Sequence, residues 1–202
     1  MGMKMKIRAT IGAAGLAALA CAGSVRAHHS YLAYQTTPFW INGTVTRVEL
    51  KNPHTLTTLE AKSEDGQVRE WAVEGPSQTA LDRRSGSGEY VPKVGDTFEV
   101  CAFPYTPPLD DSVARRRLEL RIVAGHVLVT PGGAMQVWGH GYIAGCMRSP
   151  KDQRQPWLDF LNASPQAHGL WCRQRGFPAV QSNESLKKLV DQTSALLDEP
   201  CE

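Results

Sequence analysis

Alternating apolar and polar residues fill the middle of the chain, between residues 41 and 129. Such alternation is typical of half-buried strands. It predicts a first strand over residues 41–50, a second over residues 55–61 and a third that continues from Val68 through Val73. Asn52-Pro53 ends the first strand, and Glu-Asp-Gly at 64–66 is the signal for a hairpin turn between the second and the third.

The period of the pattern changes after the third strand. Ser77 can cap a short helix through Arg84, and the glycine-containing sequence at 86–88 breaks that helix. Two more strands follow, one ending near Phe103 and one over residues 118–129. Three strands, a helix and two strands is the element order of a small five-stranded Greek-key barrel of the OB type, which closes its sheet and leaves few exposed edges.

Past Gly132-Gly133 the strand pattern stops, and the sequence becomes helical. Residues 157–173 look partly helical, and residues 183–197 carry apolar side chains along one helical face. We expect that face to pack on the barrel rather than to act as an independent interaction helix. The fold class we predict is therefore mainly β, with an OB-like barrel over residues 28–131 and a helical, disulfide-tied extension over residues 132–202.

The first 27 residues have the pattern of a cleavable signal peptide. Basic residues precede an apolar segment at 9–20, which is too short to span a bilayer, and Val25 and Ala27 are the small residues that a cleavage site after Ala27 requires. A cut after Ala22 and a lipoprotein at Cys21 are competing interpretations, which we favour less. We expect a periplasmic or secreted bacterial protein with no transmembrane span after processing.

Removal of this leader changes the sign of the net charge. Four of the 22 lysines and arginines lie in the leader, which has no acidic residue, so 18 remain against 20 aspartates and glutamates. The formal charge then changes from +2 to −2, and a nucleic-acid partner loses its support. The basic cluster at 115–117 is more typical of a solvated sheet edge than of a phosphate site.

The cysteine count agrees with export. Cys21 leaves with the leader, and four cysteines remain, an even number in a compartment where disulfides persist. Three pairings are open. We favour Cys101 with Cys146 and Cys172 with Cys201, because each pair then joins adjacent segments.

Four side chains of the extension offer a competing interpretation, a zinc site. His168 and Cys172 stand four residues apart on one predicted helical face, and His140 with Cys146 would complete two histidines and two cysteines. In an oxidising compartment, thiols are more readily consumed as disulfides. We therefore expect the bridges rather than this site.

Five short motifs stand in order along the predicted mature chain. They are Ala-His-His-Ser at 27–30, Gly-Thr-Val-Thr-x-Val-Glu at 43–49, Asn-Pro-His at 52–54, Trp-Ala-x-Glu-Gly at 71–75 and Val-Gly-Asp at 94–96. Together they resemble an uncharacterised family of small secreted bacterial proteins, a domain of unknown function, over about residues 27–130. The resemblance implies a periplasmic β-barrel and brings no established activity. The cysteine-containing extension after Gly132 departs from the family pattern.

Cleavage after Ala27 would make His28 a new amino terminus that can hold a metal. Its α-amine and imidazole, with the imidazole of His29, are nitrogen donors that suit Cu(II), the ion at the top of the divalent affinity order. His54 is the natural third donor, because Pro53 fixes the backbone of its turn. The set resembles the histidine brace of copper enzymes and carriers in residue types only, so we carry over the ligation and not the oxidative activity.

Two plainer interpretations stay open for these histidines. His28 and His29 at a flexible terminus could chelate copper or nickel without purpose, and His54 could simply hydrogen-bond a neighbouring carbonyl at its turn. Neither would make a functional site.

Signatures of enzymes are missing from the sequence. Ser30 has no nucleophile elbow, and the carboxylates Glu70 and Glu74 flank a strand without a partner motif. We therefore predict a periplasmic metal-binding protein, with copper ahead of zinc, that acts as a carrier or sensor rather than a catalyst and exchanges metal with a periplasmic protein. The alternative is a metal-free binding or assembly module that engages a periplasmic partner or small ligand through its barrel face and tail.

Overall fold

The chain divides into residues 1–31 and residues 32–202, and every element below belongs to the second unit. A computed structural model describes residues 37–63, 65–105, 116, 119–139, 142–147 and 154–201. The predicted signal peptide with its cleavage site, His28 and His29, and His140 lie outside the described residues.

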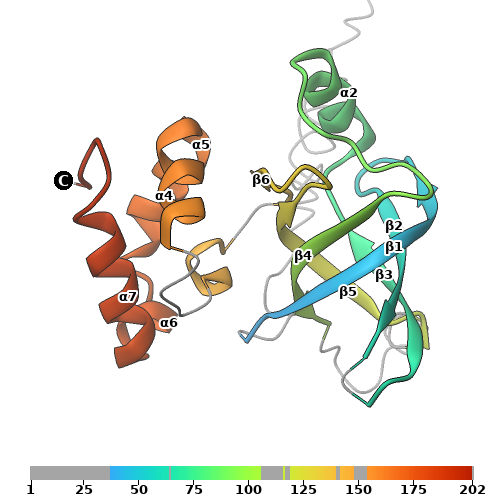
Figure 1. The fold of residues 1–202 in the computed structure, drawn as a ribbon, viewed down its shortest axis with the longest axis horizontal. Helices are drawn as coiled ribbons and strands as arrows, with labels where there is room; N and C mark the ends of the chain where they lie inside the picture. Colours follow the sequence, from blue (N-terminus) through green and yellow to red (C-terminus); the bar gives the residue numbers. More distant parts are fainter. Residues whose placement is uncertain are drawn as a thin grey trace, which may run out of the picture. The chain divides into compact units, whose positions relative to one another are not determined.

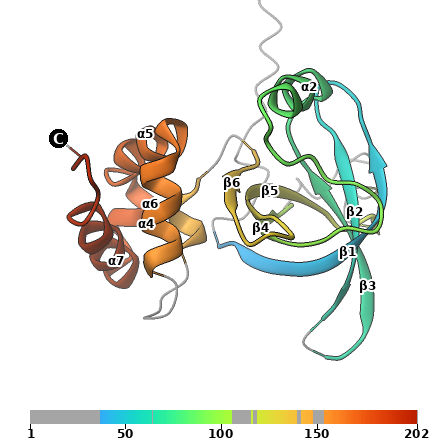
Figure 2. The same ribbon diagram turned by 45° about the horizontal axis from the view of Figure 1, so that its top comes forward.

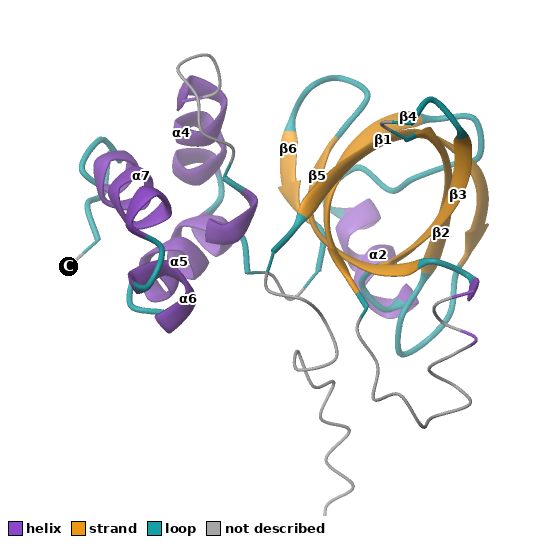
Figure 3. Cartoon of the chain, turned by 90° about the horizontal axis from the view of Figure 1, so that it is seen from below, coloured by secondary structure: helices purple, strands orange, loops and turns teal. Residues whose placement is uncertain are grey.

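Five strands form a closed barrel (Figures 1 and 3). They are β1 (Phe39–Glu49), β2 (Leu56–Lys62), β3 (Val68–Glu74), β4 (Thr97–Pro104) and β5 (Ile122–Val129). β1 pairs antiparallel with β2 and β4, β2 with β3, and β4 with β5, while a parallel pairing of β3 with β5 closes the ring. This connectivity is that of the OB type, so the predicted mainly β fold with a five-stranded barrel is confirmed.

The alternation along β1 explains how the barrel fills. Ile41, Gly43 and Val45 point inward and are buried, while the residues between them are exposed. A β-bulge between Val45 and Arg47 then shifts the register against β2 by one residue. Gly43 leaves room for the neighbouring strand, because a Cβ there would lie 2.7 Å from the Glu60 carbonyl oxygen.

The helix between β3 and β4 lies across one end of the barrel, while the β2–β3 hairpin projects from it (Figures 2 and 3). This helix is α2 (Gln78–Gly86), and the Ser77 side chain accepts a hydrogen bond from the Ala80 amide, as a cap should. Ser77 is thus the predicted cap, and the helix runs past Arg84 to Gly86. Leu81 is its buried residue and packs into the barrel core.

Two differences from the predicted strands have local causes. The fifth strand begins at Ile122 and not at residue 118, because Arg121 has a positive φ of 45° that interrupts extended backbone. A sixth strand, β6 (Met135–Val137), pairs with β5 in the region where the strand pattern was expected to stop. The sequence before β6 turns a hairpin, with Gly133 at φ 82° and its amide bonded to the Thr130 carbonyl at 2.8 Å.

In its described residues, the predicted helical extension contains a short 3-10 helix and four α-helices. They are η2 (Ala144–Cys146), α4 (Arg154–Ala163), α5 (Pro165–Gln174), α6 (Pro178–Gln181) and α7 (Glu184–Ser194). Pro165 separates α4 from α5 and occupies the first turn of α5, where it costs no hydrogen bond. Ser164 caps α5 and Asn183 caps α7 through side-chain oxygens that accept amide hydrogens.

One apolar cluster includes residues of both the barrel and the extension. Trp157 and Trp171 belong to it with ring centroids 6.0 Å apart, and so do Phe103 of β4 and Val190 of α7. Leu186, Leu189, Val190 and Leu197 of the predicted apolar face belong to this cluster or pack against it, whereas Leu196 is 49% exposed, so most of that face is covered. Within the described residues, no helix is long and apolar enough to cross a bilayer.

Candidate functional site

The Asn-Pro-His motif lies against the carboxyl end of β3. The Thr55 amide donates to the Pro76 carbonyl at 3.0 Å, and the Gly75 amide donates to the Thr55 carbonyl at 3.0 Å. Asn52 adds a side-chain contact, because its Oδ1 lies 3.4 Å from the Thr79 amide at the start of α2. These bonds place the motif at 52–54 beside the Glu-Gly end of the motif at 71–75.

His54 meets two groups of that end with its two ring nitrogens. Nδ1 lies 3.2 Å from the Gly75 carbonyl oxygen, and since a carbonyl can only accept, this contact puts the ring proton on Nδ1. Nε2 lies 4.0 Å from Oε1 of Glu74. The side chains of His54 and Glu74 are 17% and 13% exposed, so both are mostly shielded from water yet reachable from it.

This arrangement is the one that metal-binding histidines commonly use. A ligating imidazole usually donates its other N–H to a carbonyl or carboxylate, which fixes the tautomer and the ring orientation. With the proton of His54 on Nδ1, the lone pair belongs to Nε2, the nitrogen nearer to Glu74. A separation of 4.0 Å lets one ion contact both Nε2 and Oε1 at bond lengths of about 2.0–2.2 Å.

Glu74 is the residue that sequence reasoning missed. It ends β3, where its backbone pairs with Leu56 of β2 and Ala124 of β5, so three strands fix its position. The carboxylate was visible in the sequence but was given no partner. Its place in the motif at 71–75, beside the histidine of the motif at 52–54, was the signal that could have connected the two.

Gly75 must be glycine for this geometry. A Cβ at Gly75 would lie 2.6–2.8 Å from three atoms of the Trp138 indole, which is completely buried. Trp138 Nε1 and Thr55 Oγ1 are both buried and have no hydrogen-bond partner among the described residues. The carbonyl that holds His54 therefore belongs to a residue locked against a rigid aromatic ring.

Two other motifs meet each other and have a structural role. Asp96 of the Val-Gly-Asp motif accepts hydrogen bonds through Oδ2 from the Tyr90 hydroxyl at 2.6 Å and the Lys93 amide at 2.9 Å. Its carbonyl accepts from the Val45 amide at 2.8 Å, and the Gly95 amide returns a bond to the Val45 carbonyl. The motif at 94–96 thus clamps the motif at 43–49 and supplies no metal ligand to His54.

The four cysteines form the two bridges that the sequence favoured, Cys101–Cys146 and Cys172–Cys201. The competing zinc set is not assembled, because Cys146 and Cys172 belong to different bridges. His168 and Cys172 do lie together, with Nε2 3.6 Å from Sγ.

Comparison with known proteins adds the family and no activity. A family model described as "Family of unknown function (DUF6152)" matches residues 16–107, which contain all five motifs. No curated protein and no solved structure matches the chain. The predicted resemblance to an uncharacterised family is therefore confirmed: over residues 16–107 the chain is similar to DUF6152, while the helical extension lies outside the match.

Proposed function

We propose that this chain is an exported metal-binding protein in which His54 and Glu74 hold a copper ion for transport or sensing. That His28 and His29 supply further donors is the prediction from the sequence. The observation that carries the proposal is the geometry of His54. One ring nitrogen is fixed on the Gly75 carbonyl, and the other lies 4.0 Å from the Glu74 carboxylate. That is the arrangement expected of an oriented ligand.

The donor types favour copper over other divalent ions. The α-amine and imidazole of His28, with His29 and His54, supply mostly nitrogen, and Glu74 adds one oxygen. Cu(II) accepts tetragonal sets of nitrogen and oxygen and binds them more tightly than the other first-row divalent ions. The bond from His54 to a carbonyl also fits the plainer interpretation in which it only stabilises the turn, so the ion itself must be tested.

The test uses the untagged protein purified from the periplasm, loaded with one equivalent of Cu(II) and titrated with a competing chelator. Loss of a group that merely orients a ligand costs about 10–100-fold in affinity, so His54→Ala should cost at least about 100-fold. Glu74→Gln should weaken binding by about tenfold or more. Glu70→Gln is the matched control, since Glu70 is an exposed carboxylate on the same strand.

Acetylation of the amino terminus should abolish tight binding if His28 is the terminus. Unchanged affinity in both His54→Ala and Glu74→Gln would reduce the site to chelation by the terminus alone and would refute the proposal. Intact mass of the same sample reports whether the chain begins at His28, which the proposal also requires.

A second candidate function is a metal-free module for a small ligand. A cavity of about 170 Å³ is lined by, among others, Trp40, Glu99, Met135 and Trp157. Two indoles and a carboxylate suit a flat or cationic organic ligand. The cavity is smaller than the roughly 300–1,000 Å³ typical of ligand sites, which ranks this function second. It predicts that alanine at His28, His29 and His54 leaves function intact.

A further inference from the structure

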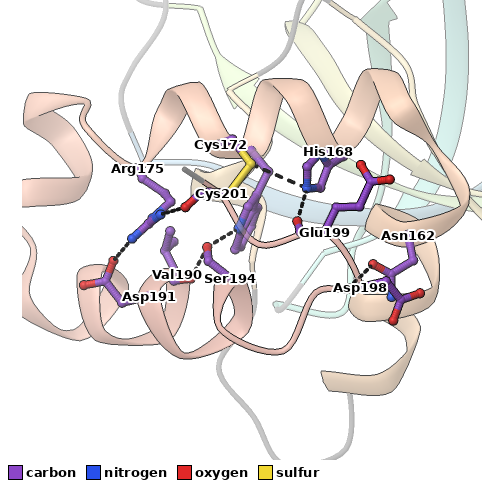
Figure 4. Close-up of a disulfide and its surroundings, with 11 residues drawn as sticks. Asn162, His168, Cys172, Arg175, Val190, Asp191, Ser194, Asp198, Glu199 and Cys201 are labelled. Atoms are coloured by element: carbon purple, nitrogen blue, oxygen red, sulfur yellow. Dashed lines mark hydrogen bonds and ion pairs between the residues drawn. A yellow bond between two sulfur atoms is a disulfide. The ribbon is translucent and has the colours of Figure 1, made fainter.

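Three potential metal ligands of the extension lie together at the end of the chain (Figure 4). α5 places His168 and Cys172 four residues apart on one face, with Nε2 3.6 Å from Sγ. The bridge brings Cys201 to the same place, and the three ligand atoms all lie within 4.8 Å of one another. Sequence reasoning grouped His168 and Cys172 with His140 and Cys146, and assigned Cys201 only to a bridge.

We propose that His168, Cys172 and Cys201 form a binding site for one thiophilic metal ion of the zinc class when a dithiol reduces the Cys172–Cys201 bridge. Two thiolates and an imidazole are ligands that zinc uses in proteins, with bonds of about 2.3 Å to sulfur and about 2.0–2.1 Å to nitrogen. This site shares no residue with the proposed copper site at His54 and does not depend on it.

The reduction is an ordinary thiol–disulfide exchange. A thiolate of the dithiol attacks Cys201 Sγ, the bond between the two cysteine sulfurs breaks, and Cys172 leaves as a thiolate that takes up a proton. The second thiol of the dithiol then attacks the mixed disulfide and releases Cys201. The dithiol leaves as a disulfide, two electrons have passed to the bridge, and both cysteines are thiols. Binding of the ion displaces their two protons.

Contacts other than the bridge keep the three ligands together after reduction. The Cys201 carbonyl accepts from Arg175 Nη1 at 3.3 Å, and Nη2 of the same arginine lies 3.6 Å from Oδ1 of Asp191 on α7. The Asp198 amide donates to Asn162 Oδ1 of α4 at 3.2 Å. Hydrogen bonds thus tie the tail to α4 and to Arg175 at the end of α5, and an ion pair ties Arg175 to α7. Reduction breaks none of these contacts.

The imidazole can serve as a ligand after its proton moves from Nε2 to Nδ1. His168 Nε2 lies 2.6 Å from the Glu199 carbonyl oxygen, so Nε2 carries the proton in the oxidised protein. With the proton on Nδ1, Nε2 has a lone pair for an ion, and the hydrogen bond to the Glu199 carbonyl is given up. The Glu199 carbonyl oxygen or a water molecule would supply the fourth ligand.

The Cys101–Cys146 bridge is an internal control for the access of a dithiol to the disulfide sulfurs. Cys101 and Cys146 are 0% and 1% exposed and belong to the apolar cluster, whereas Cys172 and Cys201 are both partly exposed. Exchange requires that the attacking thiolate reach a sulfur. A dithiol should therefore open Cys172–Cys201 in the folded protein and leave Cys101–Cys146 closed.

The experiment treats the full exported chain with dithiothreitol under native conditions, then alkylates it and maps the labelled cysteines by mass spectrometry. The expected result is label on Cys172 and Cys201 only, with an unchanged near-ultraviolet circular dichroism spectrum. After anaerobic removal of the reductant, Co²⁺ should give thiolate-to-metal absorption, and one equivalent of Zn²⁺ should displace it. Unreduced protein should give no such absorption.

Variants distinguish a site with three ligands from metal binding by two free thiols alone. His168→Ala should weaken the Zn²⁺ binding that displaces the cobalt–thiolate absorption by at least about 100-fold. Gln166→Ala, at an exposed position of the same helix, is the matched control and should leave it unchanged. Cys201→Ser should lower the cobalt–thiolate absorbance by about half, which checks the thiolates independently of His168. The proposal is overturned if the bridge opens only on unfolding, if the reduced protein binds no Zn²⁺, or if His168→Ala binds it as tightly.

Discussion

His54 in the barrel and His168 in the extension each hold one ring nitrogen against a backbone carbonyl, Gly75 in the first case and Glu199 in the second. For His54 the anchored nitrogen is Nδ1, and Nε2 lies near the Glu74 carboxylate. For His168 the anchored nitrogen is the same Nε2 that lies near the Cys172 sulfur. An ion could bind His54 with its anchoring hydrogen bond intact, whereas His168 would first have to give up its own.

The surroundings of the two histidines differ in the same way. The His54 site is fixed by backbone hydrogen bonds and by strands β2, β3 and β5 around Glu74, none of which has to change for an ion to bind. The His168 cluster is closed by a disulfide at the chain end and becomes a set of ligands only after reduction. Under the two proposals, the site in the barrel is permanent and the site in the extension forms only after reduction.

Removing one disulfide at a time should give the largest losses of unfolding free energy, and the two losses compare the barrel with the extension. The chain-entropy model gives about 4 kcal/mol for Cys101–Cys146, which joins residues 45 apart, and about 3.5 kcal/mol for Cys172–Cys201, which joins residues 29 apart. We expect the pair Cys101→Ala and Cys146→Ala to lose at least that 4 kcal/mol, because both sulfurs also fill the core.

The pair Cys172→Ala and Cys201→Ala should lose about its 3.5 kcal/mol and little more, since both cysteines are partly exposed and Arg175 and Asn162 still hold the tail in the folded state. Urea unfolding followed by tryptophan fluorescence measures both losses of unfolding free energy. A loss well above about 3.5 kcal/mol for the second pair would mean that the native contacts of the tail depend on its bridge, and that the His168 cluster falls apart when reduced.

Gly75→Ala tests how rigidly the barrel holds its site. The added methyl would lie 2.6 Å from Trp138 Nε1, and overpacking of this kind costs about 1–3 kcal/mol of unfolding free energy. Copper affinity should fall with it, because the Gly75 carbonyl orients His54. Gly86→Ala is the matched control: nothing lies within 4 Å of its added methyl, and alanine suits a helix. If Gly75→Ala changed neither the unfolding free energy nor the copper affinity, this end of β3 would not be rigid.

The barrel was predictable because its strands alternate and its turns carry recognisable residues. Ser77 marked the start of α2, and the order of elements led to the OB connectivity. β6 was missed because three residues are too few to show a period. The late start of β5 was missed because the positive φ of Arg121 leaves no mark in an alternation pattern.

The candidate site was only half predictable, for a physical reason. His54 was found from its place after Pro53, a local feature of the sequence. Its neighbour Glu74 is twenty residues away in the chain, and the two meet only because β2 pairs with β3 and the turn bonds to Gly75 and Pro76. Cys201 joined His168 in the same way, through a contact between the chain end and α5.

Alkaline pH should affect the barrel more than the extension. Burial, together with the hydrogen bond to Asp96, raises the pKa of Tyr90 above its usual value. A raised pKa means that the folded state holds the phenol proton more tightly, so its stabilising contribution is complete below about pH 10 and is lost as the pH rises above that value.

The unfolding free energy should therefore decline above pH 10, and Tyr90→Phe should flatten this decline. Tyr142→Phe should flatten it less, because burial alone raises the pKa of Tyr142. Urea unfolding at a series of pH values between about 8 and 11 measures both slopes. An unchanged slope in Tyr90→Phe would show that the Tyr90–Asp96 bond does not stabilise the clamp on β1.

Acid should reveal the smallest effect, and it lies in the extension. The hydrogen bond from Lys187, with further help from the charges of Lys187 and Arg175, lowers the pKa of Asp191. A lowered pKa stabilises the fold above the unfolded value of about 3.9, and this contribution is lost as the pH falls below it. Since the pair is largely exposed, the loss should stay under about 1 kcal/mol. Asp191→Asn should remove it, whereas Asp82→Asn on α2 controls for net charge.

Because Asp191 also holds Arg175, which bonds to the Cys201 carbonyl, the same variant should make the Cys172–Cys201 bridge easier to reduce. If dithiothreitol opens the bridge at the same rate in both variants, the tail is not held through Arg175.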